Sequence, residues 1–189
     1  DQSSVNVCSD FVVFVFACWY FHVPYTERAI LHASYAMMCV KAFGNGWNSS
    51  FWMLVLGMAQ GNVRSCILFN MVFEIIQIYH RDLCKLKGIE YGTTMAAGAM
   101  FKLPAFADDK PMVAGTSKAN LQIQLDSFCT ALVWTLTMGL RVPKCISFGW
   151  GWVDGIYGPC DPKVACNGEV LMWVGNDVAT DRMFKYVGR

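Results

Sequence analysis

Phe106-Ala107-Asp108-Asp109 places two adjacent carboxylates directly after an apolar run that begins at Met100. Apolar residues resume at Met112–Ala114, so the pattern predicts two strands, Met100–Ala107 and Met112–Ala114, joined by a tight turn at the Asp pair. Neighbouring carboxylates are costly to bury without a cation, and Mg²⁺ prefers oxygen ligands. The stretch by itself therefore indicates either a magnesium site on a hairpin or an Asp-Asp pair at a solvated turn.

Helical periodicity is clearest on either side of this stretch. Apolar residues recur at three- and four-residue steps over Ser65–Tyr79 and again over Leu121–Leu136, where Gly139 supplies a C-terminal stop. A third helix is predicted from Thr26 to about Phe43, where a Gly-Asn-Gly sequence ends it. We therefore expect helices both before and after the Asp pair.

Short runs rich in Val and aromatic residues predict strands. These runs are Phe11–Phe16, Phe51–Leu56, Ile146–Phe148, Val170–Val174 and Met183–Val187. Residues 150–168 hold many Gly and Pro and are interpreted as an irregular insertion. The order of elements predicts a single α+β domain over residues 1–189, with an antiparallel sheet and helices packed on one face.

Composition limits the class of protein. Hydrophobic residues make up 55% and charged residues 15%, yet no apolar run reaches the roughly 18 residues of a membrane span, so no membrane partner is expected. The nine cysteines form no C-x-x-C pair and only three His are available, which argues against a zinc site. An odd number of cysteines in a chain rich in core residues favours reduced thiols and an intracellular protein, nuclear or cytoplasmic.

A second motif precedes the Asp pair at Gly57–Asn70, Gly-Met-Ala-Gln-Gly-Asn-Val-Arg-Ser-Cys-Ile-Leu-Phe-Asn. It resembles motif B of reverse transcriptases, in which a Gln-Gly loop leads into a Ser-Pro-x-Leu-Phe-Asn helix. Gln60-Gly61 and Ser65 match that pattern, as do the three residues of Leu68–Asn70. A glycine in this loop lets the backbone approach a template base and an incoming nucleotide.

The later motifs follow in the family's order. Phe106–Asp109 resembles the catalytic hairpin, motif C, and Leu121–Asp126 resembles the palm helix behind it. Pro143-Lys144-Cys145 resembles motif D, in which a Lys can protonate pyrophosphate; a solvated surface Lys is the alternative. Phe184–Gly188 resembles motif E, the primer grip, in the form typical of LINE-type (non-LTR) retrotransposons.

This resemblance implies a palm-like sheet, with fingers and thumb largely absent, that performs RNA-directed DNA synthesis by two-metal nucleotidyl transfer. The implied cofactor is Mg²⁺ held by Asp108 and Asp109, and the implied partners are an RNA template, a DNA primer and deoxynucleoside triphosphates. The implied site residues are Asp108, Asp109 and Lys144 for catalysis, Tyr20, Gln60, Gly61, Ser65 and Phe106 for the nucleotide, and Lys185, Tyr186 and Gly188 for the primer grip.

The chain departs most from the family's pattern in the first motif. Anchoring on Val23-Pro24 places Val15 where the family has its other metal-binding Asp, and a Val cannot bind Mg²⁺. Asp10 is the nearest acid and lies five residues too early. Lys110-Pro111 also follows the Asp pair, where a strand would need a ladder donor. These changes indicate a degenerate copy with impaired catalysis.

Two other functions remain open at this stage. The palm could be a non-catalytic scaffold that binds nucleic acid or assembles with a partner, although a net charge of +1 is low for such a role. Alternatively, the chain could be a hydrophobic or membrane-associated protein whose motif matches are accidental, which the apolar run Phe11–Phe21 would suit.

Overall fold

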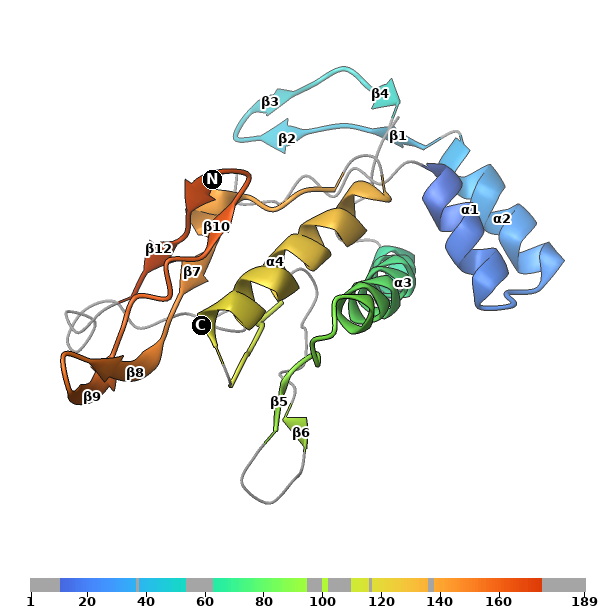
Figure 1. Ribbon diagram of the computed structural model, residues 1–189. Coiled ribbons are helices and arrows are strands. Elements are labelled where there is room, and N and C mark those ends of the chain that lie inside the picture. Colours follow the sequence, from blue (N-terminus) through green and yellow to red (C-terminus); the bar gives the residue numbers. More distant parts are fainter. Residues whose placement is uncertain are drawn as a thin grey trace. The chain divides into compact units, whose positions relative to one another are not determined.

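The computed structural model describes residues 11–36, 38–53, 63–94, 100–101, 110–115, 117–135 and 138–174. Within these ranges the chain is α+β, with helices and short, mostly antiparallel strands (Figure 1). It divides into two compact units, residues 1–77 with 132–138 and residues 78–131 with 139–189. One division between them falls within helix α3, Val63–Leu86, between Gln77 and Ile78.

The first unit opens with α1, Phe11–Tyr20, so the strand predicted over Phe11–Phe16 is wrong. Every residue of this run is apolar or aromatic, which leaves no period from which to tell a helix from a strand. The buried side chains reveal the helical face, because Val13, Phe14, Ala17 and Cys18 recur at helical spacing. Tertiary packing of that face outweighs the β propensity of the Val and Phe residues.

Helix α2, Tyr25–Ala36, confirms the third predicted helix but ends earlier than expected. The residues that follow form two nested antiparallel pairs. Strand β1, Cys39–Val40, pairs with β4, Trp52–Met53, and β2, Phe43–Gly44, pairs with β3, Trp47–Asn48. Gly46 adopts a φ of 79° in the turn between β2 and β3, a conformation that glycine tolerates without strain.

Helix α3, Val63–Leu86, and helix α4, Lys118–Val133, confirm the two periodic segments. On α3 the predicted face is buried at Leu68, Val72 and Ile76, but Tyr79 is exposed. The buried face continues instead through His80 and Cys84, at four-residue steps from Val72. On α4 the predicted positions Leu125, Phe128 and Leu132 are all buried.

The core of the second unit lies between α4 and the later strands. Leu125 of α4 packs with Val164, Cys166 and Leu171. Gln122 also ties α4 to strand β10, Ala165–Cys166, since its side-chain amide donates to the Ala165 carbonyl at 2.7 Å and accepts from the Ala165 N–H at 2.8 Å. The glutamine thus occupies the backbone groups that a neighbouring strand would use.

The hairpin predicted around the Asp pair is wrong in its second strand. Residues 112–114 have no regular secondary structure, and the Val113 carbonyl accepts a hydrogen bond from the Gln124 side chain at 3.1 Å. The Val113 carbonyl therefore has its hydrogen-bond donor on a side chain of α4 rather than on a partner strand. Strand β6, Met100–Phe101, pairs instead with β5, Thr93–Thr94. Residues 102–109 lie outside the described ranges.

Residues 150–168 are more regular than the predicted insertion. Strands β8, Trp150–Val153, and β9, Ile156–Pro159, form an antiparallel hairpin, and β10 pairs with β11, Glu169–Val170. Asp154 and Gly155 both adopt positive φ, 50° and 79°, as a two-residue hairpin turn requires. The hairpin therefore has a local cause in the Asp-Gly sequence.

The predicted strand Ile146–Phe148 is confirmed as β7, Ile146–Ser147, which pairs in parallel with β12, Met172–Trp173. Between β7 and α4 lies η1, a short 3₁₀ helix over Val142–Lys144. In the part of the chain that the structure describes, all strands pair two by two, without a larger sheet. Of the predicted strand Phe51–Leu56, Trp52–Met53 forms β4, whereas residues 54–56 lie outside the described ranges, as does the strand predicted over residues 183–187.

Candidate functional site

Most of the site residues predicted from the sequence lie outside the described ranges. These residues are Gln60, Gly61, Phe106, Asp108, Asp109, Lys185, Tyr186 and Gly188, together with Asp10. The described ones are Tyr20 and Ser65 in the first unit and Lys144 in the second. Lys144 ends η1 and its side chain is exposed.

Val15 and Tyr20 lie on α1 rather than on a strand. Val15 is 43% exposed and lines a pocket, so the position matched to the metal-binding Asp presents only a branched alkyl group. Tyr20 is also partly exposed, and its ring packs edge-on against Phe21 with centroids 5.2 Å apart. Helix α1 therefore offers no carboxylate for a metal ion.

Ser65, predicted on the nucleotide side, lies in the first turn of α3 and is buried. Its hydroxyl is 3.0 Å from the hydroxyl of Tyr35 on α2. A buried hydroxyl pair of this kind satisfies both polar groups. In this structure Ser65 therefore links the start of α3 to the end of α2.

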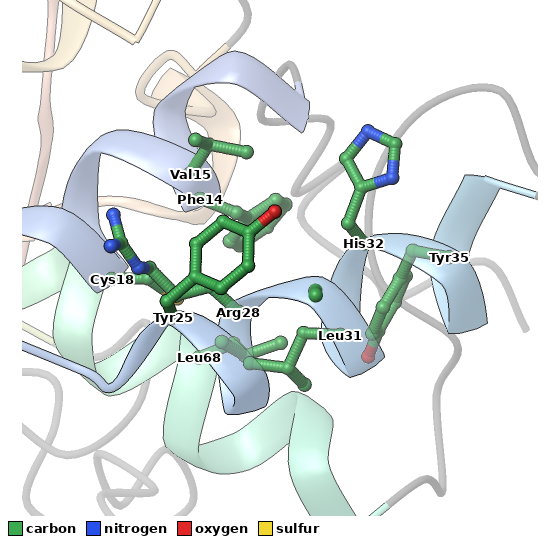
Figure 2. A pocket seen from close by; sticks show the side chains of 10 residues that line it. Phe14, Val15, Cys18, Tyr25, Arg28, Leu31, His32, Tyr35 and Leu68 are labelled. Carbon is green, nitrogen blue, oxygen red and sulfur yellow. The ribbon is translucent and has the colours of Figure 1, made fainter.

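Tyr35 also lines the pocket, which has a volume of about 350 Å³ (Figure 2). Phe14 and Val15 of α1, Leu31 of α2 and Leu68 of α3 give it apolar walls. All of these side chains belong to the first unit. The volume falls within the range of roughly 300–1,000 Å³ that is usual for small-molecule sites.

Arg28 of α2 is the cation of this pocket. Its Nε is buried and, among the described residues, has no hydrogen-bond partner. The guanidinium lies 6.0 Å from the centre of the Tyr25 ring, and Figure 2 shows the two side chains next to each other. Burial raises the pKa of the neighbouring Cys18 thiol, and the positive charge of Arg28 opposes that rise. Cys18 is therefore a protonated wall residue rather than a nucleophile.

A second polar cluster is buried in the other unit, around His80 of α3. The side chain is fully buried, and its Nε2 donates to the Gln124 backbone carbonyl of α4 at 2.9 Å. Because a carbonyl only accepts, the neutral ring must carry its proton on Nε2. The Nδ1 atom is buried and has no partner in the described ranges.

The surroundings of His80 hold it neutral. Its pKa is lowered from 6.5 to about 4, first by burial and then by the positive charges of Lys110 and Lys87, while the bond to the Gln124 carbonyl opposes the shift. The Lys110 ammonium lies over the rings of Tyr91 and Phe128, at 4.9 and 5.2 Å from their centres. A histidine with so low a pKa is a structural hydrogen-bond donor and not a proton shuttle near neutral pH.

Two thiols meet in the core of the second unit. The Sγ atoms of Cys129 on α4 and Cys166 on β10 are 3.2 Å apart. Burial raises the pKa of Cys129 to about 12, and the hydrogen bond and charge of Cys166 add to the effect. The Cys129 thiol therefore stays protonated near neutral pH and is unreactive as a nucleophile.

Metal and membrane sites were sought in the same ranges. Across the described residues, no three His, Cys, Asp or Glu side chains gather closely enough to hold a metal ion. None of the helices that the structure describes is both long enough and apolar enough to cross a bilayer.

Sequence reasoning missed Arg28, His80 and Gln124. His80 could have been found, because it continues the four-residue step of the α3 core from Val72 and Ile76. Gln124 adjoins Leu125 on α4, but no sequence pattern predicts that its amide faces Val113. Arg28 could not have been found either, since its pocket depends on how three helices pack.

Comparison with models of known protein families gives no match. A search of curated proteins likewise finds no similar sequence. The order and spacing of the motifs are thus what remains to indicate a family.

Proposed function

We propose that this chain is a reverse transcriptase domain of the LINE type by descent, built on a palm-like sheet, that no longer extends a primer. Its ancestral reaction is two-metal transfer of deoxynucleotides from their triphosphates to a DNA primer on an RNA template. Asp108 and Asp109 are the proposed ligands of Mg²⁺, and Gln60-Gly61 the proposed loop beside the nucleotide.

The observation that carries the proposal is the contact between the two helices that follow these motifs. Helix α3 starts at Val63, two residues after Gly61, and α4 follows the Asp pair. The two helices meet where His80 donates to the Gln124 carbonyl at 2.9 Å and packs against Phe128 with ring centroids 5.3 Å apart. Motif B and motif C of the family are likewise each followed by a helix of the palm.

Loss of catalysis follows from the first motif. Two-metal transfer needs carboxylates on both sides of the ions, and Val15 supplies none. The run that would carry this carboxylate is the helix α1, whose buried face is apolar. Asp108 and Asp109 alone would leave the ion between primer end and triphosphate without its main protein ligand.

The loss of that ligand also favours the second candidate, a non-catalytic scaffold that binds nucleic acid or assembles with a partner. Such a scaffold would bind a primer–template duplex without divalent ions, with an affinity that falls as salt rises. The net charge of +1 limits the number of phosphates that it can neutralise. The polymerase ancestry and the scaffold role therefore differ in their dependence on metal.

Primer extension tests the loss of catalysis. The chain is incubated with a DNA primer on an RNA template, the four deoxynucleoside triphosphates and Mg²⁺ or Mn²⁺. We expect no product above that of the Asp108→Asn variant. Extension by the unaltered chain that disappears in this variant would show that catalysis survives, and would leave the ancestry standing.

The ancestry itself is tested by Mn²⁺, which broadens the NMR signals of nearby amides. We expect broadening at both Asp108-Asp109 and Gln60-Gly61, and its disappearance in the Asp108→Asn, Asp109→Asn double variant. Glu169, which is exposed on β11, provides a matched carboxylate control as Glu169→Gln. Broadening at the Asp pair without Gln60-Gly61, or none at either, would overturn the polymerase ancestry.

A further inference from the structure

The pocket of the first unit combines two kinds of surface (Figure 2). Phe14, Val15, Leu31 and Leu68 supply alkyl and ring surface, whose burial by a ligand is favourable because it removes apolar area from water. Arg28 supplies a permanent positive charge, since a guanidinium does not lose its proton in proteins. A complementary ligand therefore needs an apolar body and one anionic end.

The state of Arg28 favours an incoming acceptor. A buried N–H without an acceptor is unfavourable, because its hydration has been lost and nothing replaces it. Within the described ranges the Nε of Arg28 is in this state, and the Tyr25 ring, 6.0 Å from the guanidinium carbon, offers only its π face. An anionic oxygen placed here would gain a charge-assisted hydrogen bond that the protein alone does not provide.

The single positive charge of Arg28 favours a carboxylate over a phosphate as the anionic end of the ligand. A guanidinium presents a planar fork that matches the two oxygens of a carboxylate. Among the described residues that line the pocket, Arg28 is the only Lys or Arg, so a phosphate dianion would keep uncompensated charge against apolar walls. A neutral ligand of the same shape would offer the Nε of Arg28 at most an uncharged acceptor, and therefore a weaker hydrogen bond.

We propose that this pocket binds a monocarboxylate with an apolar body, of the class of a medium-chain fatty acid, with the carboxylate on Arg28. Its body lies along Phe14, Leu31 and Leu68. The site is independent of the polymerase ancestry, because it uses none of the residues assigned to metal, nucleotide or primer. It also gives Val15 a role, as part of an apolar wall.

Isothermal titration of the full chain with decanoate, below the concentration at which decanoate aggregates, tests this proposal. We expect one saturable site per chain, with weaker binding of decanol, no measurable binding of acetate and none of inorganic phosphate. Decanol removes the charge and keeps the chain, whereas acetate keeps the charge and removes the chain. Equal affinity for decanoate and decanol, or tighter binding of phosphate, would overturn the proposal.

Variants locate the site. Arg28→Met keeps the aliphatic stem and should weaken decanoate at least about tenfold, as expected for a lost charge-assisted hydrogen bond, while decanol is unaffected. Arg81→Met, an exposed arginine on α3 that does not line the pocket, is the matched control. Ala29→Leu narrows the pocket without removing a charge and should weaken both ligands. Unchanged decanoate binding in a folded Arg28→Met or Ala29→Leu chain would refute the assigned position.

Discussion

Acid should destabilise this chain through His80 in particular. The ring is fully buried and donates to the Gln124 carbonyl, and its pKa is lowered from 6.5 to about 4. Because the folded pKa lies below the unfolded one, the unfolded chain takes up a proton first as the pH falls. The stabilisation is complete above pH 6.5 and is lost as the pH falls from there toward 4.

The size of the loss follows from the two pKa values. Each unit of difference corresponds to about 1.4 kcal/mol, so the fall from 6.5 to about 4 should remove about 3 kcal/mol of unfolding free energy. His80→Gln is the matched variant, because its amide can still donate to the Gln124 carbonyl but does not titrate. The difference between the two proteins cancels the contribution of the carboxylates, which titrate in the same range.

Urea unfolding followed by tryptophan fluorescence at several pH values between 7 and 4 measures this difference. The unaltered chain should lose about 3 kcal/mol more than His80→Gln over that range. Lys110→Met should reduce the excess, since the charge of Lys110 is one of the causes that lower the pKa of His80. Parallel curves for the unaltered chain and His80→Gln, or a His80 NMR titration near 6.5, would refute the argument.

Replacing Gly149 with alanine should cost about 1–3 kcal/mol of unfolding free energy, because the added Cβ would lie 2.5 Å from a backbone oxygen. Gly158→Ala, whose Cβ meets nothing within 4 Å, is the control, and equal urea midpoints would contradict the close approach. Gln124→Met should cost about 1–3 kcal/mol, since two carbonyls lose the amide that donates to them, and an unchanged midpoint would speak against those bonds. Near neutral pH, Cys129 should resist iodoacetamide while the exposed Cys39 reacts, because burial and a second thiol 3.2 Å away raise the pKa of Cys129 to about 12. Mass spectrometry of the labelled peptides checks this, and equal labelling would count against the buried pair.

The sequence predicts the long helices well because each has one apolar face and one polar face. Helices α3 and α4 both show apolar residues at three- and four-residue steps, and both were found in the structure. The same rule gives no answer for Phe11–Tyr20, where all ten residues are apolar or aromatic. In such a run only the packing of neighbouring helices decides between strand and helix.

The hairpin β8–β9 was predictable but was missed. Its Asp154-Gly155 pair follows aromatic residues at alternating positions, Phe148, Trp150 and Trp152, and an Asp-Gly pair in such a setting is a strong local pattern for a hairpin. The same holds for Asn167-Gly168, which joins β10 to β11 with φ values of 52° and 84°. The many Gly and Pro residues in this region led to the prediction of an irregular insertion, because the individual hairpin turns were not considered one by one.

The candidate site was less predictable than the fold. Sequence motifs locate side chains along the chain, whereas the pocket around Arg28 arises from side chains on three helices. The hydrogen bond from the Gln124 amide to the Val113 carbonyl likewise joins a helix to a segment that its short apolar run had assigned to a strand. A hydrogen bond between a side chain and a backbone group produces no periodic pattern of residues, so it cannot be predicted from the sequence in the way that a helix can.

The pairing contacts of β8 and β9 all lie within the ten residues Trp150–Pro159, and hairpins of this kind close in about 1–10 μs. The contact of His80 with Gln124 must instead close a loop of 44 residues, which is entropically more costly. Trp152, 74% exposed, therefore stands beside Tyr157 on an open aromatic face before the helices have met. We therefore expect chains that refold at high concentration to associate through these rings, so the yield of folded protein should fall as concentration rises.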